Sequence, residues 1–258
     1  MSTTMIDSVT MFRRDLKHAL RFPMMTISGI GTAVIFLLLF VGVFGDALGA
    51  DFLPSGGGRY IDYLAPGIIL MAAGTSTAAT AIKVNQDIQE GIIARLRTMS
   101  IARMSVLTGQ VIGSLVRTLI SVVLVVLVAL ALGFRPSATP LEYLAALGVF
   151  AMLTFALTWL AVAFGLATKT VAGANSLTLI LQFLPLISSA FLPTDSMPAG
   201  VAWFAEHQPY TPIIETIRGL LMGSGIGDSA LWSVGWCVVL AAAGFAWSRA
   251  LYNRPRKA

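Results

Sequence analysis

The sequence predicts an all-α integral membrane protein with six transmembrane helices and an N-terminal amphipathic interfacial helix. Apolar residues make up 57% of the chain and charged residues only 11%, whereas a soluble domain usually carries about 25% charged residues. Six apolar runs are each close to the ~20 residues that a helix needs to cross the hydrocarbon core. They lack the polar/apolar alternation of barrel strands, so helix is the expected structure.

The six runs form one expected membrane domain, 1–258, and fall at 26–46, 64–83, 109–133, 141–167, 171–192 and 230–250. In the fifth run, Gln182 and Pro185 interrupt the apolar residues. We expect the proline to kink this helix, and the freed carbonyl groups to find other donors. Arg117, in the third run, shares a face with Gly109 and Gly113. We expect a structural arginine that reaches the inner interface, with contact to a substrate as the alternative.

The segment 5–22 precedes the first run and is expected to lie along the inner membrane surface. A proline at position 23 ends the predicted helix. An apolar face with basic residues beside it is typical of an interfacial helix, and a solvated helix packed on a partner is the alternative. The apolar residues that recur at helical spacing are Ile6, Val9, Phe12, Leu16 and Leu20.

The loops divide the basic residues unevenly. With six spans both termini lie on one side, and thirteen Lys and Arg residues fall on that side: Arg13, Arg14, Lys17, Arg21, Lys83, Arg95, Arg97, Arg103, Lys169, Arg249, Arg254, Arg256 and Lys257. Three fall on the other side: Arg59, Arg135 and Arg218. Basic loops stay in the cytoplasm, so we expect a multi-pass protein of the cell membrane with both termini cytoplasmic.

The connector between the second and third runs, 84–105, is rich in charge. Its apolar residues Ile88, Ile92, Ile93, Leu96 and Met99 recur at helical spacing. A short amphipathic helix of mixed charge can insert into a cleft on another protein. The alternative is a solvated loop that carries only the bias toward cytoplasmic basic residues. The charged residues are Asp87, Glu90, Arg95, Arg97 and Arg103.

Several motifs occur in order along almost the whole chain. They are Tyr63-Leu64-Ala65-Pro66-Gly67; Asp87 with Glu90-Gly91, Arg95-Leu96-Arg97 and Arg103; Gly133-Phe134-Arg135; Phe191-Leu192-Pro193; and Gln208-Pro209 with Arg218-Gly219-Leu220-Leu221-Met222-Gly223. Together they resemble the permease subunit of type-2 ATP-binding-cassette (ABC) exporters, most closely the daunorubicin-resistance permeases. The resemblance implies a transport permease that moves an amphipathic or apolar cargo outward, such as a drug, lipid or glycolipid.

The resemblance also implies partners. The connector would be the coupling helix that binds a separate nucleotide-binding ATPase subunit, through Asp87, Glu90, Gly91, Arg95, Leu96, Arg97 and Arg103. The 258 residues contain no Gly-Lys pair, so the phosphate-binding loop of an ATPase is absent. ATP and magnesium are therefore expected on the partner, and no cofactor on this chain. The expected assembly has two permeases, most simply a homodimer, and two ATPases in the lipid bilayer.

The region 193–229 is expected to be external, and the resemblance implies that it forms short re-entrant helices before the last span. Glu215 and Arg218 lie three residues apart on one predicted helix. A charge near the membrane interior is costly unless it is paired or hydrated, so this pair is the expected outer gate. An exposed surface pair of little energetic value is the alternative.

Other classes of function are less consistent with the composition. One cysteine and two histidines offer neither a disulfide nor a metal site, and no catalytic cluster lies within the spans. The basic balance reflects loop orientation, so no nucleic acid partner is expected. An ion-gradient-driven secondary transporter remains the alternative function, although it would require acidic residues in mid-span, where none occurs.

Overall fold

The computed structural model describes residues 23–48, 60–93, 95 and 103–253, and every regular element in this part of the chain is a helix. The expected all-α class is therefore confirmed. The expected interfacial helix at 5–22 lies outside the described residues. The α-helices and the two short 3₁₀ helices are α2 (Pro23–Leu48), α3 (Tyr60–Gln89), α5 (Arg103–Ala131), α6 (Pro140–Ala167), α7 (Val171–Phe183), η1 (Leu184–Ile187), η2 (Thr194–Ser196), α8 (Ala199–His207), α9 (Tyr210–Met222) and α10 (Ser229–Asn253).

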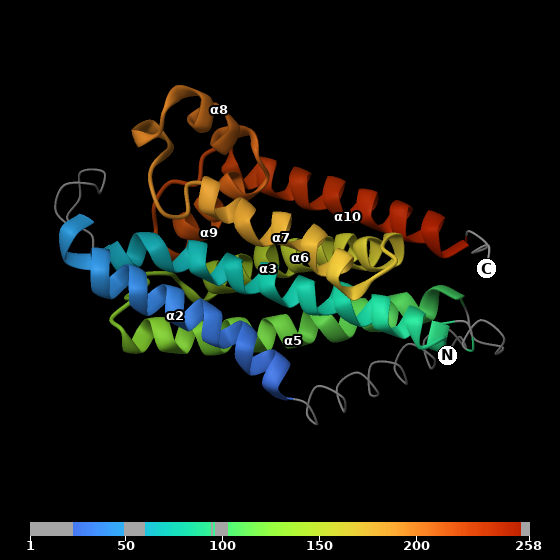
Figure 1. Ribbon diagram of the computed structural model, residues 1–258. Coiled ribbons are helices and arrows are strands. Elements are labelled where there is room, and N and C mark those ends of the chain that lie inside the picture. The colour runs from blue at the N-terminus through green and yellow to red at the C-terminus, as the bar shows by residue number, and fades with distance from the viewer. Residues whose placement is uncertain (1–22, 49–59, 94, 96–102, 254–258) are drawn as a thin grey trace.

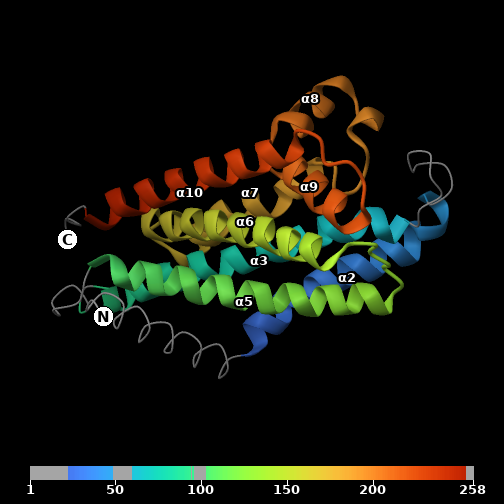
Figure 2. The ribbon, with the colours of Figure 1, turned by 180° about the vertical axis from the view of Figure 1, so that it is seen from behind.

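The long helices run side by side, as Figures 1 and 2 show from opposite directions. Helix α3 lies in the middle and packs against α2, α5, α6 and α7, while α10 packs along α6. The short helices α8 and α9 gather at one end of the bundle (Figure 1). The end of α3, the start of α5 and the end of α10 lie at the opposite end. Helix α3 therefore connects the two ends of the molecule.

Four helices in the described part are long and apolar enough to cross a membrane: Tyr60–Gln89, Leu107–Ala131, Pro140–Ala167 and Ser229–Asn253. They coincide with the second, third, fourth and sixth expected spans. Two shorter apolar helical segments, Gly31–Val43 and Val171–Ile187, fall within the first and fifth expected spans. The fifth differs most from expectation, because α7 ends at Phe183 and the 3₁₀ turn η1 follows it.

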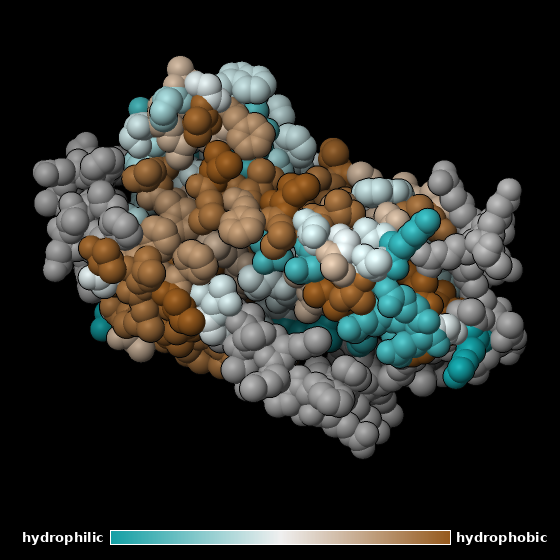
Figure 3. Space-filling view, viewed as in Figure 1, coloured by the Kyte–Doolittle hydropathy of each residue, from teal (hydrophilic) through white to brown (hydrophobic). Residues whose placement is uncertain are grey.

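The surface is apolar over the middle of the bundle, as Figure 3 shows. Large hydrophobic side chains are exposed on the long helices, among them Leu39 on α2 and both Ile180 and Phe183 on α7. Hydrophilic side chains gather over α8 and toward the opposite end (Figure 3). An apolar band between two more polar ends matches the cross-section of a lipid bilayer.

Glycine permits the closest helix contacts. A Cβ atom on Gly244 of α10 would lie 2.8 Å from the amide nitrogen of Leu160 in α6. A Cβ atom on Gly165 of α6 would lie 2.6 Å from the carbonyl oxygen of Ala81 in α3. Small residues at helix interfaces let backbones approach closely, which is a main source of helix association in lipid. These two glycines therefore hold α6 tightly between α3 and α10.

Candidate functional sites at the two ends of the bundle

The helix break after α7 forms the core of the first site, and the predicted role of Pro185 is confirmed. Proline has no N–H group, so the carbonyl of Leu181 loses the donor that a continuous helix would supply. The hydroxyl of Tyr210, at the start of α9, donates to this carbonyl at 2.9 Å. Tyr210 is only 1% exposed. Helix α9 therefore satisfies the carbonyl that the proline leaves unpaired.

The backbone after η1 is also held by side chains from the α8–α9 region. The amide group of Gln208 donates to the carbonyl of Ile187. The main-chain N–H of Ser189 donates to the hydroxyl of Thr211 at 3.4 Å. Non-helical backbone is tolerated at membrane depth only where protein or water satisfies it. Side chains from α9 and from Gln208, just before it, supply these hydrogen bonds, so the fold stabilises the helix break.

Arg218 of α9 ties three parts of this site together. Its Nε and Nη2 atoms donate to the carbonyl oxygen of Tyr63 in α3, at 3.3 and 3.2 Å. Its Nη2 atom also donates to the carbonyl of Ser189 at 2.6 Å. The guanidinium carbon lies 3.7 Å from the centre of the Tyr63 ring, where the ring attracts a cation. One side chain thus joins α9, the first turn of α3 and the backbone after η1.

The Tyr63 hydroxyl completes the contact, because it donates to the same Ser189 carbonyl at 2.9 Å. We call the set of Tyr63, Ser189 and Arg218 the arginine clamp. Charge-assisted hydrogen bonds are stronger than neutral ones, and they are strengthened further where little water is present. The clamp therefore stabilises one particular spacing between α3, α9 and the segment after η1.

Glu215 lies on the same helix as Arg218 but has a different hydrogen-bond partner. Its carboxylate accepts from the hydroxyl of Ser229, at the start of α10, at 3.0 Å. Both charged side chains are partly buried. The hydrogen bonds of the described residues join Arg218 to α3 and Glu215 to α10, and they do not join the pair to each other. The two residues therefore attach α9 to two different long helices.

The second site is the connector after α3, at the opposite end. Gly91 adopts the left-handed conformation, with φ of +71°, which glycine accepts most readily and which ends the helix. Glu90 and Arg95 are exposed. Asp87, in contrast, is 7% exposed and accepts a hydrogen bond from Gln110 of α5 at 2.6 Å. Its carboxylate thus holds α3 to α5 at the base of the connector.

The base of the connector is also bound to the turn between α6 and α7. The side-chain amide of Asn85, which is fully buried, donates to the carbonyls of Gly165 and Thr168 at 3.1 and 2.8 Å. Gln89 donates to the carbonyl of Lys169 at 3.3 Å. A displacement of the connector would therefore act directly on α3, α5 and α6.

The remaining connector residues from the sequence prediction are less fully described. Arg103 is the first residue of α5. Leu96 and Arg97 lie outside the described residues. The binding of a partner by the connector stays a prediction.

Sequence reasoning assigned no structural role to three important polar residues: Asn85, Gln208 and Tyr210. Each donates to a main-chain carbonyl that belongs to another element. A usable signal was present, because a polar side chain in so apolar a chain costs free energy unless it is hydrogen-bonded. That signal predicts that a partner exists, but it does not identify the partner.

Comparison with known proteins adds independent findings. Residues 8–222 match the family described as "ABC-2 type transporter". A daunorubicin resistance ABC transporter permease protein from Streptomyces coeruleorubidus is 25% identical over 242 residues, which are 93% of this chain and 82% of the relative. A probable doxorubicin resistance ABC transporter permease protein from Mycobacterium tuberculosis is 26% identical over 215 residues, 81% of this chain and 77% of the relative. The predicted resemblance is confirmed.

Proposed function

Because the chain belongs to the ABC-2 type transporter family, we propose that it is the permease subunit of an ATP-driven exporter. In this proposal it moves an amphipathic or apolar cargo outward, and a separate ATPase subunit supplies the energy. The family match over 8–222 is the observation that carries the proposal. The names of the two relatives refer to resistance to daunorubicin and doxorubicin. They support a drug as the cargo, ahead of a lipid or glycolipid.

In the proposed orientation the chain crosses the cell membrane six times. Both termini and the connector 84–105 lie in the cytoplasm. The uneven distribution of Lys and Arg supports it. The end of α3 and the end of α10 lie at the same end of the bundle, away from α8 and α9 (Figure 1), as the orientation requires. The region 193–229 is then external, with α8 and α9 as its short helices.

The proposed coupling runs through α3. The ATPase binds the connector, where Glu90 and Arg95 are exposed. Hydrogen bonds at Asn85 and Asp87 pass the movement to the neighbouring helices. Helix α3 has 30 residues, or about 45 Å of helical rise, and its first turn carries Tyr63. Movement at the connector therefore reaches the arginine clamp along one continuous helix.

The arginine clamp is the proposed outer gate, with Glu215 as its attachment to α10. In the closed state Arg218 holds the first turn of α3 against Ser189. Tilting of α3 after ATP binding separates Tyr63 from Arg218 and frees the cargo to leave. A partly buried arginine that has lost these carbonyls must be hydrated, and the opened cavity provides the water.

The proposed assembly contains two permeases, related by two-fold symmetry, and two ATPases that bind ATP and magnesium between them. Closed cyclic dimers are the commonest symmetric assemblies. Helices α2 and α7 expose apolar side chains, among them Leu39, Ile180 and Phe183. This apolar surface suits contact with lipid or with a second copy of the chain.

Transport into inside-out vesicles tests the function. Vesicles containing the chain and its ATPase subunit are expected to accumulate doxorubicin when ATP is added. Accumulation should persist when ionophores collapse the ion gradients, and it should stop when the phosphate-binding lysine of the ATPase is replaced. Uptake that needs an ion gradient and ignores ATP would overturn the proposal in favour of a secondary transporter.

A further inference from the structure

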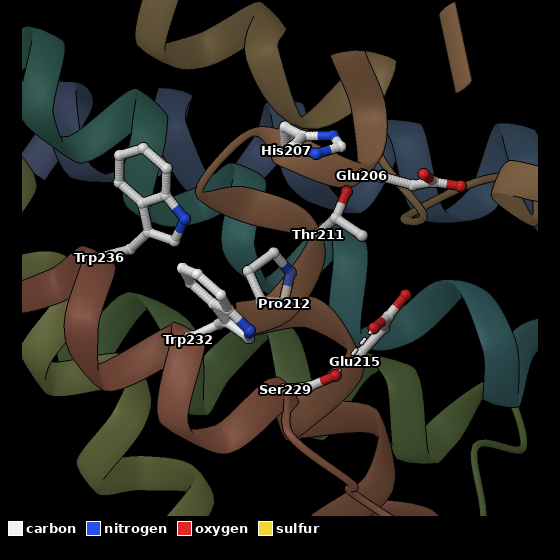
Figure 4. A pocket seen from close by; sticks show the side chains of 8 residues that line it. All are labelled: Glu206, His207, Thr211, Pro212, Glu215, Ser229, Trp232 and Trp236. Atoms are coloured by element: carbon white, nitrogen blue, oxygen red, sulfur yellow. Dashed lines mark hydrogen bonds between the residues drawn. The ribbon is translucent and has the colours of Figure 1, made fainter. Parts of the chain in front are cut away.

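A pocket with both acidic and aromatic lining residues lies beside the arginine clamp, among α8, α9 and the first turns of α10. It has a volume of about 400 Å³ and is lined by side chains that include Glu206, Glu215, Trp232 and Trp236 (Figure 4). Pockets of this size accommodate a ligand headgroup or a small ring system. The clamp residues Tyr63, Ser189 and Arg218 do not line it, whereas Glu215, which attaches the proposed gate to α10, does.

Two tryptophans form one wall of the pocket. Trp232 and Trp236 are four residues apart on α10, so they lie on the same face of the helix. Trp232 is 63% exposed. Both lie among the first eight residues of a candidate membrane span, Ser229–Asn253, where tryptophan marks the boundary between lipid and water. Their indole faces attract cations, and a ligand with an apolar body could extend from here into the lipid.

Two carboxylates lie across the pocket from the tryptophans in Figure 4. Glu206 is exposed and has no hydrogen-bond partner among the described residues. Glu215 accepts one hydrogen bond, from Ser229, and so keeps further acceptor capacity. The nearby cation, Arg218, directs its donors to Tyr63 and Ser189. The lining therefore offers two carboxylates and contains no lysine or arginine; His207 also lines the pocket, with its Nδ1 atom 2.8 Å from the carbonyl oxygen of Trp203.

The combination of acidic groups and aromatic faces selects the chemistry of the ligand. A bare metal ion prefers several oxygen or nitrogen ligands in close array, and the described residues contain no group of three suitable side chains. An organic ammonium group suits both walls, because it bonds to carboxylates and is attracted by indole rings. A volume of about 400 Å³ also leaves room for its substituents.

We propose that this pocket binds the ammonium group of an amphipathic molecule at the membrane boundary. The position of the site on the outer side rests on the proposed function; the binding itself requires neither ATP nor the ATPase. The ammonium group belongs either to exported cargo or to the headgroup of a lipid. In both cases Glu206 and Glu215 neutralise the charge, and the indoles of Trp232 and Trp236 pack against the carbon atoms around it.

Binding to the purified chain without its ATPase tests the inference. The chain is placed in phosphatidylglycerol nanodiscs, which contain no ammonium lipid, and radiolabelled dodecyltrimethylammonium is titrated in. The double variant Glu206→Gln, Glu215→Gln is expected to raise the Kd about ten-fold or more, since two attractive charges are lost. Trp232→Leu should raise it roughly three-fold to ten-fold, the ordinary effect of losing a cation–π contact.

Two matched variants control for general effects. Asp195→Asn removes an exposed carboxylate from the same region outside the pocket, and Trp247→Leu removes a tryptophan near the other end of α10. Both should bind the probe like the native chain. Each variant is first shown to be monodisperse, and Glu215→Gln alone serves if the double variant fails to fold. Unchanged binding by a folded pocket variant, or equal losses in the controls, would overturn the site.

Competition experiments in a second series of nanodiscs identify the source of the ammonium group. If phosphatidylethanolamine competes with the probe in the native chain but not in the pocket variants, the site holds a lipid headgroup. If doxorubicin competes and phosphatidylethanolamine does not, the site holds cargo. A native chain that binds ammonium here but fails to export doxorubicin would retain the pocket and lose the proposed function, so the two failures are distinguishable.

Discussion

Arg218 contacts Tyr63 in two ways at once: it donates to the main-chain oxygen at 3.2 Å, and its guanidinium carbon lies 3.7 Å from the ring centre. The two residues are 155 positions apart in sequence. They join the first turn of α3 to α9, at the end of the bundle away from the connector (Figure 1). Because α3 also carries the base of the connector, a change at either end acts on the same helix.

Tyr210→Phe should destabilise the chain without disturbing its packing. The substitution removes the one donor that replaces the helical partner of the Leu181 carbonyl. An unsatisfied buried acceptor costs about 1–3 kcal/mol, so the midpoint of thermal unfolding in detergent should fall. Tyr143→Phe is the matched control, because Tyr143 is 43% exposed. Equal midpoints for the two variants would show that the break in α7 does not depend on Tyr210.

Gly244→Ala should weaken the contact between α6 and α10. The added methyl group would lie 2.8 Å from the Leu160 amide nitrogen, and overpacking of this kind costs typically about 1–3 kcal/mol. Gly235→Ala makes the same change on the same helix where nothing lies within 4 Å. Thermal unfolding should separate the two variants, with only Gly244→Ala destabilised. Similar losses at both positions would point to a general intolerance of α10.

Charge reversal on the connector should uncouple the permease from its ATPase. The double variant Glu90→Lys, Arg95→Glu alters two exposed charges and keeps both Asp87 and its partner Gln110. Co-purification of the ATPase subunit should fall, while membrane insertion stays normal. The control Asp195→Lys changes an exposed charge at the other end and should leave co-purification intact. Undiminished association and transport in the double variant would remove the support for a coupling role.

The positions of the long helices were predictable because each needs one long apolar run and the bilayer sets its length. The kink at Pro185 was predictable for a similarly local reason, the missing N–H group. The partners of Arg218 were not. Sequence spacing brings it next to Glu215, whereas its hydrogen bonds go to Tyr63 and Ser189, on elements that only the tertiary fold brings close.

Asp87 illustrates the same limit at the connector. A charged residue in a charged stretch suggests contact with a partner, but the structure buries this carboxylate against Gln110. Neither residue type nor helical spacing reports a neighbour 23 positions away. Sequence reasoning therefore proposed a candidate site at each end of the chain's bundle, while the contacts that connect those sites to the helices required the fold.

Thiol labelling in intact cells tests the proposed orientation of the chain in the membrane. After replacement of Cys237, single cysteines are introduced at Ser100, in the connector, and at Ser137, near the start of α6. An impermeant maleimide should label Ser137→Cys and spare Ser100→Cys, because the basic loops are expected inside. Disruption of the membrane should then expose Ser100→Cys. The reverse pattern in intact cells would invert the topology and the direction of export with it.

Glu215→Gln should be milder than Arg218→Ala in a transport assay. The amide can still accept a hydrogen bond from Ser229, so α9 keeps its attachment to α10. Arg218→Ala, in contrast, removes all the hydrogen bonds from Arg218 to Tyr63 and Ser189. Equal losses from the two substitutions would assign the effect to charge alone.

The most direct test of the gate is the amount of cargo moved per ATP hydrolysed, measured in proteoliposomes that contain the permease and its ATPase. Arg218→Ala and Arg218→Lys are compared with the native chain, because lysine keeps the charge but lacks the planar fork that reaches two carbonyls and stacks on the ring. Both variants should hydrolyse ATP at the native basal rate and move less cargo per ATP, by about five-fold or more for a coupling of ordinary strength. A native ratio of cargo to ATP in Arg218→Ala would contradict the clamp as the outer gate.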